Sequence, residues 1–317
     1  MQNRIVTPGG SHGPLRRRAL GLVAAAALLP LAACNLDDAL QVDNPYVVTP
    51  PVARDTINLP NTYAGARARF ATALSGRQNR EGGLILQSGM LADEFINTDG
   101  FATRQAIDRR ASSESNAAAL DPYTYLQRTR AEAVNAAALF ATTSQSGSVE
   151  HANLYNLVGY SELLLAETFC SGVPLSIVDV NGQFQPGAQQ STSALVDSAI
   201  ASFQTALTMA QALGADGASE LNLARVGMAR ALSFVGRYTE AAALAAQVPD
   251  GFRYWVEYDA ATQDTYNVVY QIGNEEKRWG TRNNEGTNGL VWKGDPRTPV
   301  DSLSSVANDG GATGPFF

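Results

Sequence analysis

The feature that most constrains the fold is a series of segments between residues 149 and 248 with apolar side chains at helical spacing. In the clearest one, 149–169, apolar side chains recur every three or four positions, at Leu154, Leu157, Val158, Leu165 and Phe169. This spacing places them on one face of a helix, which can then be buried. Further helices are predicted from Thr192 to the glycines at 214 and 217, over 219–235 and over 239–248. The chain is therefore predicted to be mainly α-helical.

Capping and turn residues predict where the earlier helices begin and end. Asn61 is a candidate N-cap for a helix that stops near Gly76. Two glycines introduce a second apolar helix over 84–91. Asp121 and Pro122 predict the start of a third helix, because aspartate caps helices and proline suits the first turn.

Two of the later segments have the spacing of tetratricopeptide repeats. Ala199, Phe203 and Ala206 match the small-large-small face of a second repeat helix, and residues 236–241 match the turn between two repeat helices. Small residues let paired helices approach closely, and Phe203 and Tyr238 are expected to fill the gap between them. The matching alanines at 199 and 241 are 42 residues apart, so irregular tetratricopeptide-like hairpins are predicted, over 59–248.

The character of the sequence changes after Pro249. Aromatic and β-branched residues alternate in part and predict short strands, at Phe252, Tyr254, Trp255, Tyr258, Tyr266, Val268, Val269 and Tyr270. Residues 280–317 are rich in Gly, Asn and Asp and predict loops. The segment 249–317 is therefore expected to be a strand-and-loop portion that follows the helices, as the polar segment 181–190 is expected to be a short loop between helices.

The first 33 residues have the pattern of a signal peptide. Four arginines precede an apolar run over 19–33, and small residues stand just before Cys34. Leu31-Ala32-Ala33-Cys34 resembles the lipobox of bacterial lipoproteins. The resemblance implies cleavage before Cys34 and acylation of its sulfur, so that fatty acids such as palmitate anchor the protein to a bilayer. The alternative is an ordinary secretory signal cut nearby. The polar, proline-punctuated segment 34–58 is predicted to be an extended tether.

Composition and charge exclude several classes of function. The leader carries four arginines and no acidic residue, so its removal changes the formal net charge from −7 to −11. Such an acidic chain repels phosphate backbones, so we expect no nucleic acid partner.

The residue types that most often perform catalysis are scarce. After cleavage His151 is the only histidine and Cys170 the only cysteine besides Cys34. A zinc site with histidine or cysteine ligands cannot be built at a recognisable spacing, and we expect no cofactor. His151 is predicted to lie on the surface near a helix start, and Cys170 to be a small buried residue.

Three strings of residues together resemble one family of proteins. They are Glu81-Gly82-Gly83-Leu84-Ile85-Leu86 leading to Asp93-Glu94-Phe95, then Asn156-Leu157-Val158-Gly159-Tyr160 leading to Ala166-Glu167-Thr168-Phe169-Cys170-Ser171-Gly172-Val173-Pro174, and Asn284-Glu285-Gly286-Thr287-Asn288-Gly289-Leu290. With the lipobox and the irregular tetratricopeptide-like helices, they resemble the SusD/RagB-like outer-membrane nutrient-uptake lipoproteins. The resemblance extends over most of residues 34–300. Members of this family usually continue with further helices, so the chain is expected to lack their C-terminal part.

The resemblance implies a function without catalysis. Such proteins bind an oligosaccharide or other nutrient and deliver it to a TonB-dependent, SusC-like transporter in the outer membrane. Asn35 stands where an aspartate would favour retention at the inner membrane, and Asp37 and Asp38 resemble a signal for surface export. We therefore expect a surface-exposed, lipid-anchored protein of the outer membrane.

Tryptophans are the candidate ligand-binding residues. Trp255, Trp279 and Trp292 are the only three, and all follow residue 249. The apolar face of a pyranose ring stacks on an aromatic face, so each could serve as a platform for a sugar, and each could equally pack in a core. Tyr254 and Tyr270 are expected to serve packing.

Two other functions fit the sequence. A tetratricopeptide-type adaptor would bind envelope proteins rather than small ligands. A surface glycoside hydrolase would need two carboxylates across a cleft. The acidic pairs that could supply them are expected to be solvated or capping groups instead: Asp93 with Glu94, Glu162 with Glu167, and Glu275 with Glu276.

Overall fold

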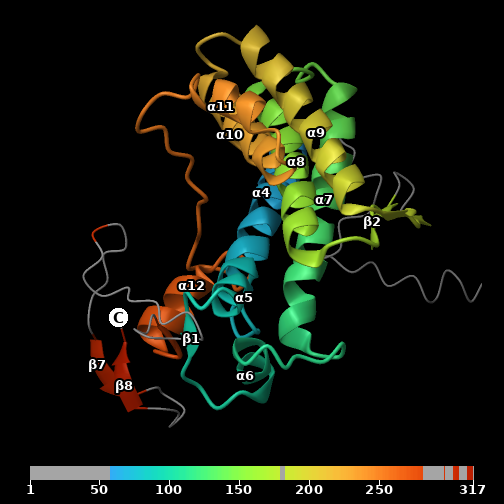
Figure 1. The fold of residues 1–317 in the computed structure, drawn as a ribbon. Helices are drawn as coiled ribbons and strands as arrows, with labels where there is room; N and C mark the ends of the chain where they lie inside the picture. Colours follow the sequence, from blue (N-terminus) through green and yellow to red (C-terminus); the bar gives the residue numbers. More distant parts are fainter. Residues whose placement is uncertain (1–57, 179–182, 281–295, 297–302, 307–312, 317) are drawn as a thin grey trace, which may run out of the picture. The chain divides into compact units, whose positions relative to one another are not determined.

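The computed structural model describes residues 58–178, 183–280, 296, 303–306 and 313–316 (Figure 1). Over these residues the protein is mainly α-helical, with nine α-helices and a few short strands, as the sequence predicted. All of them belong to one of the two compact units of the chain, residues 50–317. The leader 1–33, the lipid-attachment residue Cys34, most of the tether and Trp292 lie outside the described residues.

Six helices form the main bundle. They are α4 (Leu59–Ser75), α7 (Ala117–Ala141), α8 (Val149–Phe169), α9 (Thr192–Ala212), α10 (Ala218–Phe234) and α11 (Tyr238–Ala245). Figure 1 shows α8 beside both α7 and α9, and α8 packs against both. As a result, 14 of the 21 residues of α8 are buried, more than the single apolar face that the sequence predicted.

Phe203 occupies the centre of the packing between α8, α9 and α10. Its side chain is fully buried. A Cβ atom added at Gly159 of α8 would lie 2.7 Å from the Phe203 ring, and one at Gly227 of α10 would lie 2.4 Å from it. The two glycines therefore let three helices approach the same ring, and Ala199 and Ala206 are buried beside it, as predicted. Tyr238 does not share this role, because it is 69% exposed.

The N-caps of α4, α7 and α9 lie one to five residues before the predicted ones. α4 begins after Asn58 rather than at Asn61. At α7 the Asn116 side chain accepts a hydrogen bond from the backbone N–H of Ala118 at 2.9 Å. Asn116 therefore caps α7, and Pro122 lies inside the helix. At α9 the cap is Ser191, one residue before the predicted Thr192.

A second apolar cluster involves shorter elements. The helix α5 (Leu84–Leu91) lies where the sequence predicted it, whereas α6 (Ala102–Asp108) was not predicted. The short α12 (Val268–Tyr270) continues into a π-helix, Gln271–Glu275. Two short strands, β1 (Ile96–Asn97) and β6 (Trp279–Gly280), pair antiparallel. Leu86, Met90, Ile107, Ala118, Val268, Ile272 and Trp279 form this cluster.

The prediction of strands after Pro249 is largely wrong. Residues 252–258 adopt no regular secondary structure, and Val268, Val269 and Tyr270 form α12. Conversely, β7 (Leu303–Val306) and β8 (Thr313–Phe316) pair antiparallel where a loop was predicted. β propensity fails here because strands depend on a partner strand, which local sequence does not supply.

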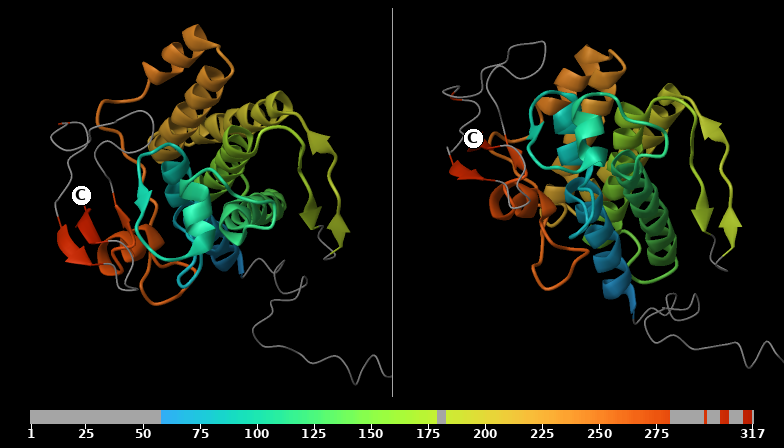
Figure 2. Two further views of the ribbon diagram at one scale, coloured as in Figure 1. Left: turned by 60° about the horizontal axis from the view of Figure 1, so that its bottom comes forward. Right: turned by 90° about the horizontal axis from the view of Figure 1, so that it is seen from below.

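The predicted loop 181–190 also carries strands. β2 (Val173–Pro174) pairs with β5 (Gln189–Gln190), and β3 (Ile177–Val178) pairs with β4 (Phe184–Gln185). Figure 2 shows this two-stranded ribbon next to the helix bundle. In these pairings backbone N–H and C=O groups form hydrogen bonds with each other, whereas in a loop the same groups would bond to water.

Two single residues lie in environments opposite to those predicted. His151 is buried, because its ring packs between Phe140 and Tyr155 and its Nδ1 accepts a hydrogen bond from the N–H of Gly147 at 3.0 Å. Burial lowers the pKa of His151. Cys170 is exposed, because it occupies the C-cap of α8 with a φ of 59° and lies outside the bundle core.

Candidate ligand-binding groove

An open groove of about 550 Å³ lies along α4. Its floor consists of Ala64, Arg67, Ala68 and Phe70 of α4 and Leu157 of α8, and the segment 254–259 forms the opposite wall. The two alanines leave room above the helix because their side chains are short. Trp255 is part of the wall and is 70% exposed.

The extended conformation of residues 252–258 explains why Trp255 is exposed. Along this segment burial alternates, so that residues 252, 254, 256 and 258 are half-buried while 253, 255 and 257 are exposed. Successive side chains of an extended chain point to opposite sides. Tyr254 therefore lies on the more buried side of the segment, as predicted for a packing residue, and Trp255 lies on its exposed side.

A buried polar cluster holds Tyr254 against the bundle. The Nδ2 of Asn153 donates hydrogen bonds to the hydroxyl of Tyr254 at 2.9 Å and to Oε2 of Glu220 at 2.8 Å. The Nδ2 of Asn156 donates to the same Glu220 oxygen at 2.9 Å. Tyr63 of α4 completes the cluster by donating from its hydroxyl to Oδ1 of Asn153 at 3.2 Å.

Glu220 carries the charge of this cluster. It is 5% exposed. Burial raises its pKa, while the hydrogen bonds from Asn153 and Asn156 and the nearby Arg67 act in the opposite direction. A buried carboxylate is costly unless it is hydrogen-bonded, so the two asparagine amides are what make this position tolerable for an acid.

Ion pairs join the segment after α11 to α4. At the groove, the Nη2 of Arg67 lies 2.9 Å from Oε2 of Glu257. Beyond the groove, Asp264 forms ion pairs with Arg69 of α4 and with Arg77, which follows α4. The backbone N–H of Gln78 also donates to the carbonyl of Gln263 at 3.0 Å. The wall and the residues that follow it are therefore attached to α4 and to the turn after α4.

The groove combines an aromatic face with polar groups at its rim. Trp255 offers a flat apolar surface, and Arg67, Glu257, Asp259 and Thr265 line the same groove. This combination suits a ligand with apolar ring faces and hydroxyl groups, because the ring can stack while the hydroxyls form hydrogen bonds. Arg67 and Thr265 were not singled out by the sequence, since an exposed arginine on a helix carries no distinctive signal.

The three tryptophans have different positions. Trp255 lines the groove, whereas Trp279 is only 2% exposed and belongs to the second apolar cluster. Trp279 cannot act as a platform in this conformation, because β6 pairs with β1 and turns the indole into the core. Trp292 lies outside the described residues. Tyr270 is about half exposed and does not line the groove.

At least one member of each acidic pair considered from the sequence forms an ion pair with an arginine. The prediction that they are solvated is wrong for Asp93 and Glu162, which are buried. The ion pairs are Asp93 with Arg110 at 2.7 Å, Glu162 with Arg130 at 2.9 Å, Glu167 with Arg230 at 2.6 Å and Glu276 with Arg278 at 3.2 Å. Each of these carboxylates therefore contributes to folding contacts.

The described residues offer neither a metal-binding cluster nor a membrane-spanning helix. In the part of the chain that the structure describes, no three His, Cys, Asp or Glu side chains gather to hold a metal ion. The described helices also include none with the length and apolar character that a bilayer span requires.

Fold and groove together define a mainly helical protein with an open aromatic groove. No family model and no curated protein matches the chain.

Proposed function

We propose that this protein is a lipid-anchored, non-catalytic binding protein that captures an oligosaccharide in the Trp255 groove. The observation that carries the proposal is the exposed indole of Trp255 on the wall of a groove of about 550 Å³. The Arg67–Glu257 ion pair at the rim supplies donors and acceptors for sugar hydroxyls. An exposed tryptophan is costly in water, and a stacked ligand would cover it.

The resemblance to SusD/RagB-like lipoproteins supports the cellular role. It rests on the sequence strings at 81–95, 156–174 and 284–290 and on the lipobox that ends at Cys34. In this proposal the fatty acids on Cys34 anchor the protein at the surface of the outer membrane. It then delivers its ligand to a TonB-dependent, SusC-like transporter.

The way the later helices pack fits the same proposal. The α9–α10 and α10–α11 pairs pack as successive hairpins, with Phe203 between small residues. This arrangement supports an irregular tetratricopeptide-like scaffold. Two of the sequence strings that carry the resemblance lie in helices. Residues 84–86 form the start of α5, and residues 156–160 lie near the middle of α8.

A binding experiment tests the proposed groove. The full chain, purified in detergent, is titrated calorimetrically with a panel of oligosaccharides. The variant Trp255→Ala is expected to lose about tenfold in affinity, because stacking and burial of an aromatic ring together contribute roughly 1–2 kcal/mol. Tyr238→Ala is the matched control, since Tyr238 is an equally exposed aromatic residue that does not line the groove. Equal affinities of both variants and the parent chain would refute the groove.

The anchor has a separate test. Mass spectrometry of the mature protein from membranes is expected to find a diacylated N-terminal Cys34. The variant Cys34→Ala is expected to abolish that modification and release the protein from the membrane fraction. An unmodified thiol on the mature protein would contradict the anchor without affecting the groove.

The adaptor remains a second candidate, and one observation favours it. Phe234, Val235 and Tyr238 are all exposed at the turn between α10 and α11. A docking protein could cover such an apolar surface. Crosslinking in intact cells distinguishes the two functions: an adaptor would yield protein adducts at residue 238, and its partners would be lost in Tyr238→Glu but not in Trp255→Ala.

A further inference from the structure

A second cavity is separate from the Trp255 groove. It has a volume of about 380 Å³, and no residue lines both sites. Four segments form it: the turn 79–81, the start of α6, the start of α7 and the residues that follow α12. We refer to it as the arginine cavity, after Arg80, Arg104 and Arg278 in its lining.

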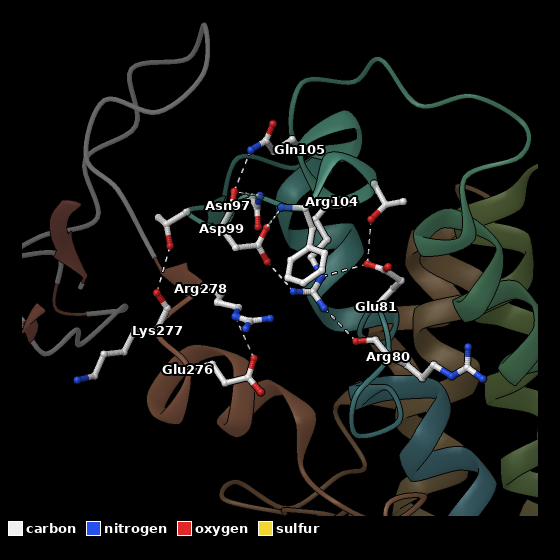
Figure 3. A network of polar contacts seen from close by, with 12 residues as sticks. Arg80, Glu81, Asn97, Asp99, Arg104, Gln105, Glu276, Lys277 and Arg278 are labelled. Atoms are coloured by element: carbon white, nitrogen blue, oxygen red, sulfur yellow. Dashed lines mark hydrogen bonds and ion pairs between the residues drawn. The ribbon is translucent and has the colours of Figure 1, made fainter. Parts of the chain in front are cut away.

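Arg104 forms hydrogen bonds that join several segments of the cavity wall. As Figure 3 shows, its guanidinium lies among Asp99, Glu81 and the carbonyl of Arg80. Nε donates to Oε2 of Glu81 at 3.1 Å, Nη1 donates to Oδ2 of Asp99 at 2.5 Å, and Nη2 donates to the carbonyl oxygen of Arg80 at 3.1 Å. The guanidinium carbon Cζ of Arg104 also lies 4.8 Å from the centre of the Phe101 ring. All three nitrogens of Arg104 therefore have a partner within the protein, so Arg104 serves mainly as a structural group.

The π-helix places two polar side chains of the cavity together. Its wider turn brings Gln271 and Glu276 to the same side, where Nε2 of Gln271 donates to Oε1 of Glu276 at 2.8 Å. The Oε1 of Gln271, on a side chain only 7% exposed, has no hydrogen-bond partner among the described residues. Most buried polar atoms have a partner, and π-turns occur often at functional sites. An unpartnered acceptor in a cavity wall indicates a missing donor.

Both signs of charge are available for a ligand in this cavity. Asp121 is half-buried, and none of the described residues donates a hydrogen bond to its carboxylate. The Nε of Arg278 lies 3.2 Å from Oε2 of Glu276 without forming a hydrogen bond, and the guanidinium stacks on Phe101. None of the described residues accepts a hydrogen bond from its two terminal nitrogens. Arg80 acts on Asp121 only through its electric field.

The formal charges of the lining balance. Arg80, Arg104 and Arg278 are offset by Glu81, Asp121 and Glu276. A ligand that carried only one charge would unbalance the cavity, whereas one that carried both would satisfy donor and acceptor groups together. A cavity of this size holds a small molecule rather than a chain of sugars.

We propose that the arginine cavity binds a small zwitterion with one ammonium and one carboxylate group, of the amino-acid class. The ammonium donates to Asp121 and to Oε1 of Gln271. The carboxylate accepts from the terminal nitrogens of Arg278. The site is independent of the sugar groove proposed above.

A series of ω-amino acids tests the proposal and measures the spacing between the charges. The full chain in detergent is titrated calorimetrically with glycine, β-alanine, 4-aminobutyrate and 6-aminohexanoate, and with acetate, methylammonium and glucose as comparisons. At least one zwitterion is expected to bind tenfold or more tightly than either singly charged compound.

Substitutions assign the binding to the cavity. Asp121→Asn and Arg278→Gln are each expected to weaken zwitterion binding at least tenfold. Lys277→Gln is the matched control, because Lys277 neighbours Arg278 in sequence but does not line the cavity, and its side chain extends away from the network in Figure 3. Thermal unfolding checks that each variant is folded. If Arg278→Gln does not fold, Asp121→Asn decides the outcome.

Four results would overturn the proposal. They are the absence of binding by every zwitterion in the series, equal binding of acetate or methylammonium, an equal loss in Lys277→Gln, and binding of glucose that Asp121→Asn abolishes. Trp255→Ala separates the two sites, since it is expected to leave zwitterion binding unchanged. Failure of the sugar groove would therefore not be mistaken for failure of the cavity.

Discussion

The amide of Asn153 donates a hydrogen bond to the hydroxyl of Tyr254 across 101 residues of sequence. Asn153 is buried in the second turn of α8, and Tyr254 immediately precedes Trp255. This contact holds the Tyr254 side of the extended segment against the bundle, which leaves Trp255 on the exposed side.

Removal of that hydroxyl is expected to loosen the wall of the groove. The variant Tyr254→Phe keeps the ring but leaves Asn153 with one fewer acceptor, so we expect a loss of about 1 kcal/mol in the free energy of unfolding and weaker oligosaccharide binding. Urea denaturation and calorimetric titration measure the two effects. Tyr270→Phe is the control, because the Tyr270 side chain is half exposed and outside the groove. Equal effects of the two substitutions would contradict the role of the contact.

The packing around Phe203 predicts opposite effects for two glycine-to-alanine substitutions in helices. Gly227→Ala places a methyl group 2.4 Å from the Phe203 ring, and such overpacking is expected to cost about 1–3 kcal/mol. Gly65→Ala in α4 meets no atom within 4 Å, so it is expected to stabilise the helix by up to about 1 kcal/mol. Thermal and urea unfolding compare both with the parent chain. A neutral Gly227→Ala would show that the helices separate more easily than their packing indicates.

Glu220 is expected to make stability depend on pH. Burial raises its pKa in the folded protein, so between the ordinary glutamate pKa of about 4.5 and the raised value the folded state binds more protons than the unfolded state. Its contribution to stability is therefore greatest below that range and is lost as pH rises through it. The amide of Glu220→Gln does not titrate, so the variant should gain stability relative to the parent chain as pH rises. Urea unfolding between pH 4 and pH 8 measures this difference, and parallel curves would contradict it.

The buried ion pair between Arg104 and Asp99 is expected to matter far more than an exposed one. The Asp99 side chain has no exposed surface, so Arg104→Met leaves a buried carboxylate without its main partner, at a cost of about 3–5 kcal/mol. The exposed pair of Arg237 and Glu240 provides the control. Arg237→Met is expected to leave the unfolding midpoint unchanged, because water already solvates both groups. Similar midpoints for the two variants would mean that Asp99 finds another partner.

Several elements could be predicted from local sequence alone. The helix 149–169 and the helix 84–91 were predicted at their observed bounds, and the turn before α11 lies at Gly236. These succeed because helical periodicity and glycine conformations are properties of neighbouring residues. Helix starts were less well predicted, as Asn116 shows, because several nearby polar side chains can compete for the same cap.

The environments of single side chains could not be predicted in this way. His151 and Cys170 lie at the two ends of α8, yet the histidine is buried and the cysteine exposed. The difference arises because Phe140 of α7 covers the first turn of α8, whereas Cys170 falls where the chain leaves the helix. The position of a residue along a helix does not tell which other helix will cover it.

By itself the sequence determined that the chain builds a mostly helical scaffold, because the spacing of apolar residues acts over one or two turns. Only the tertiary structure decided that Trp255 is exposed on a groove while Trp279 is buried in a core. The two tryptophans are chemically identical, and their exposure depends on segments far away in the chain. Arg67 and Glu257, 190 residues apart, hold the first in the groove wall; the pairing of β6 with β1 buries the second.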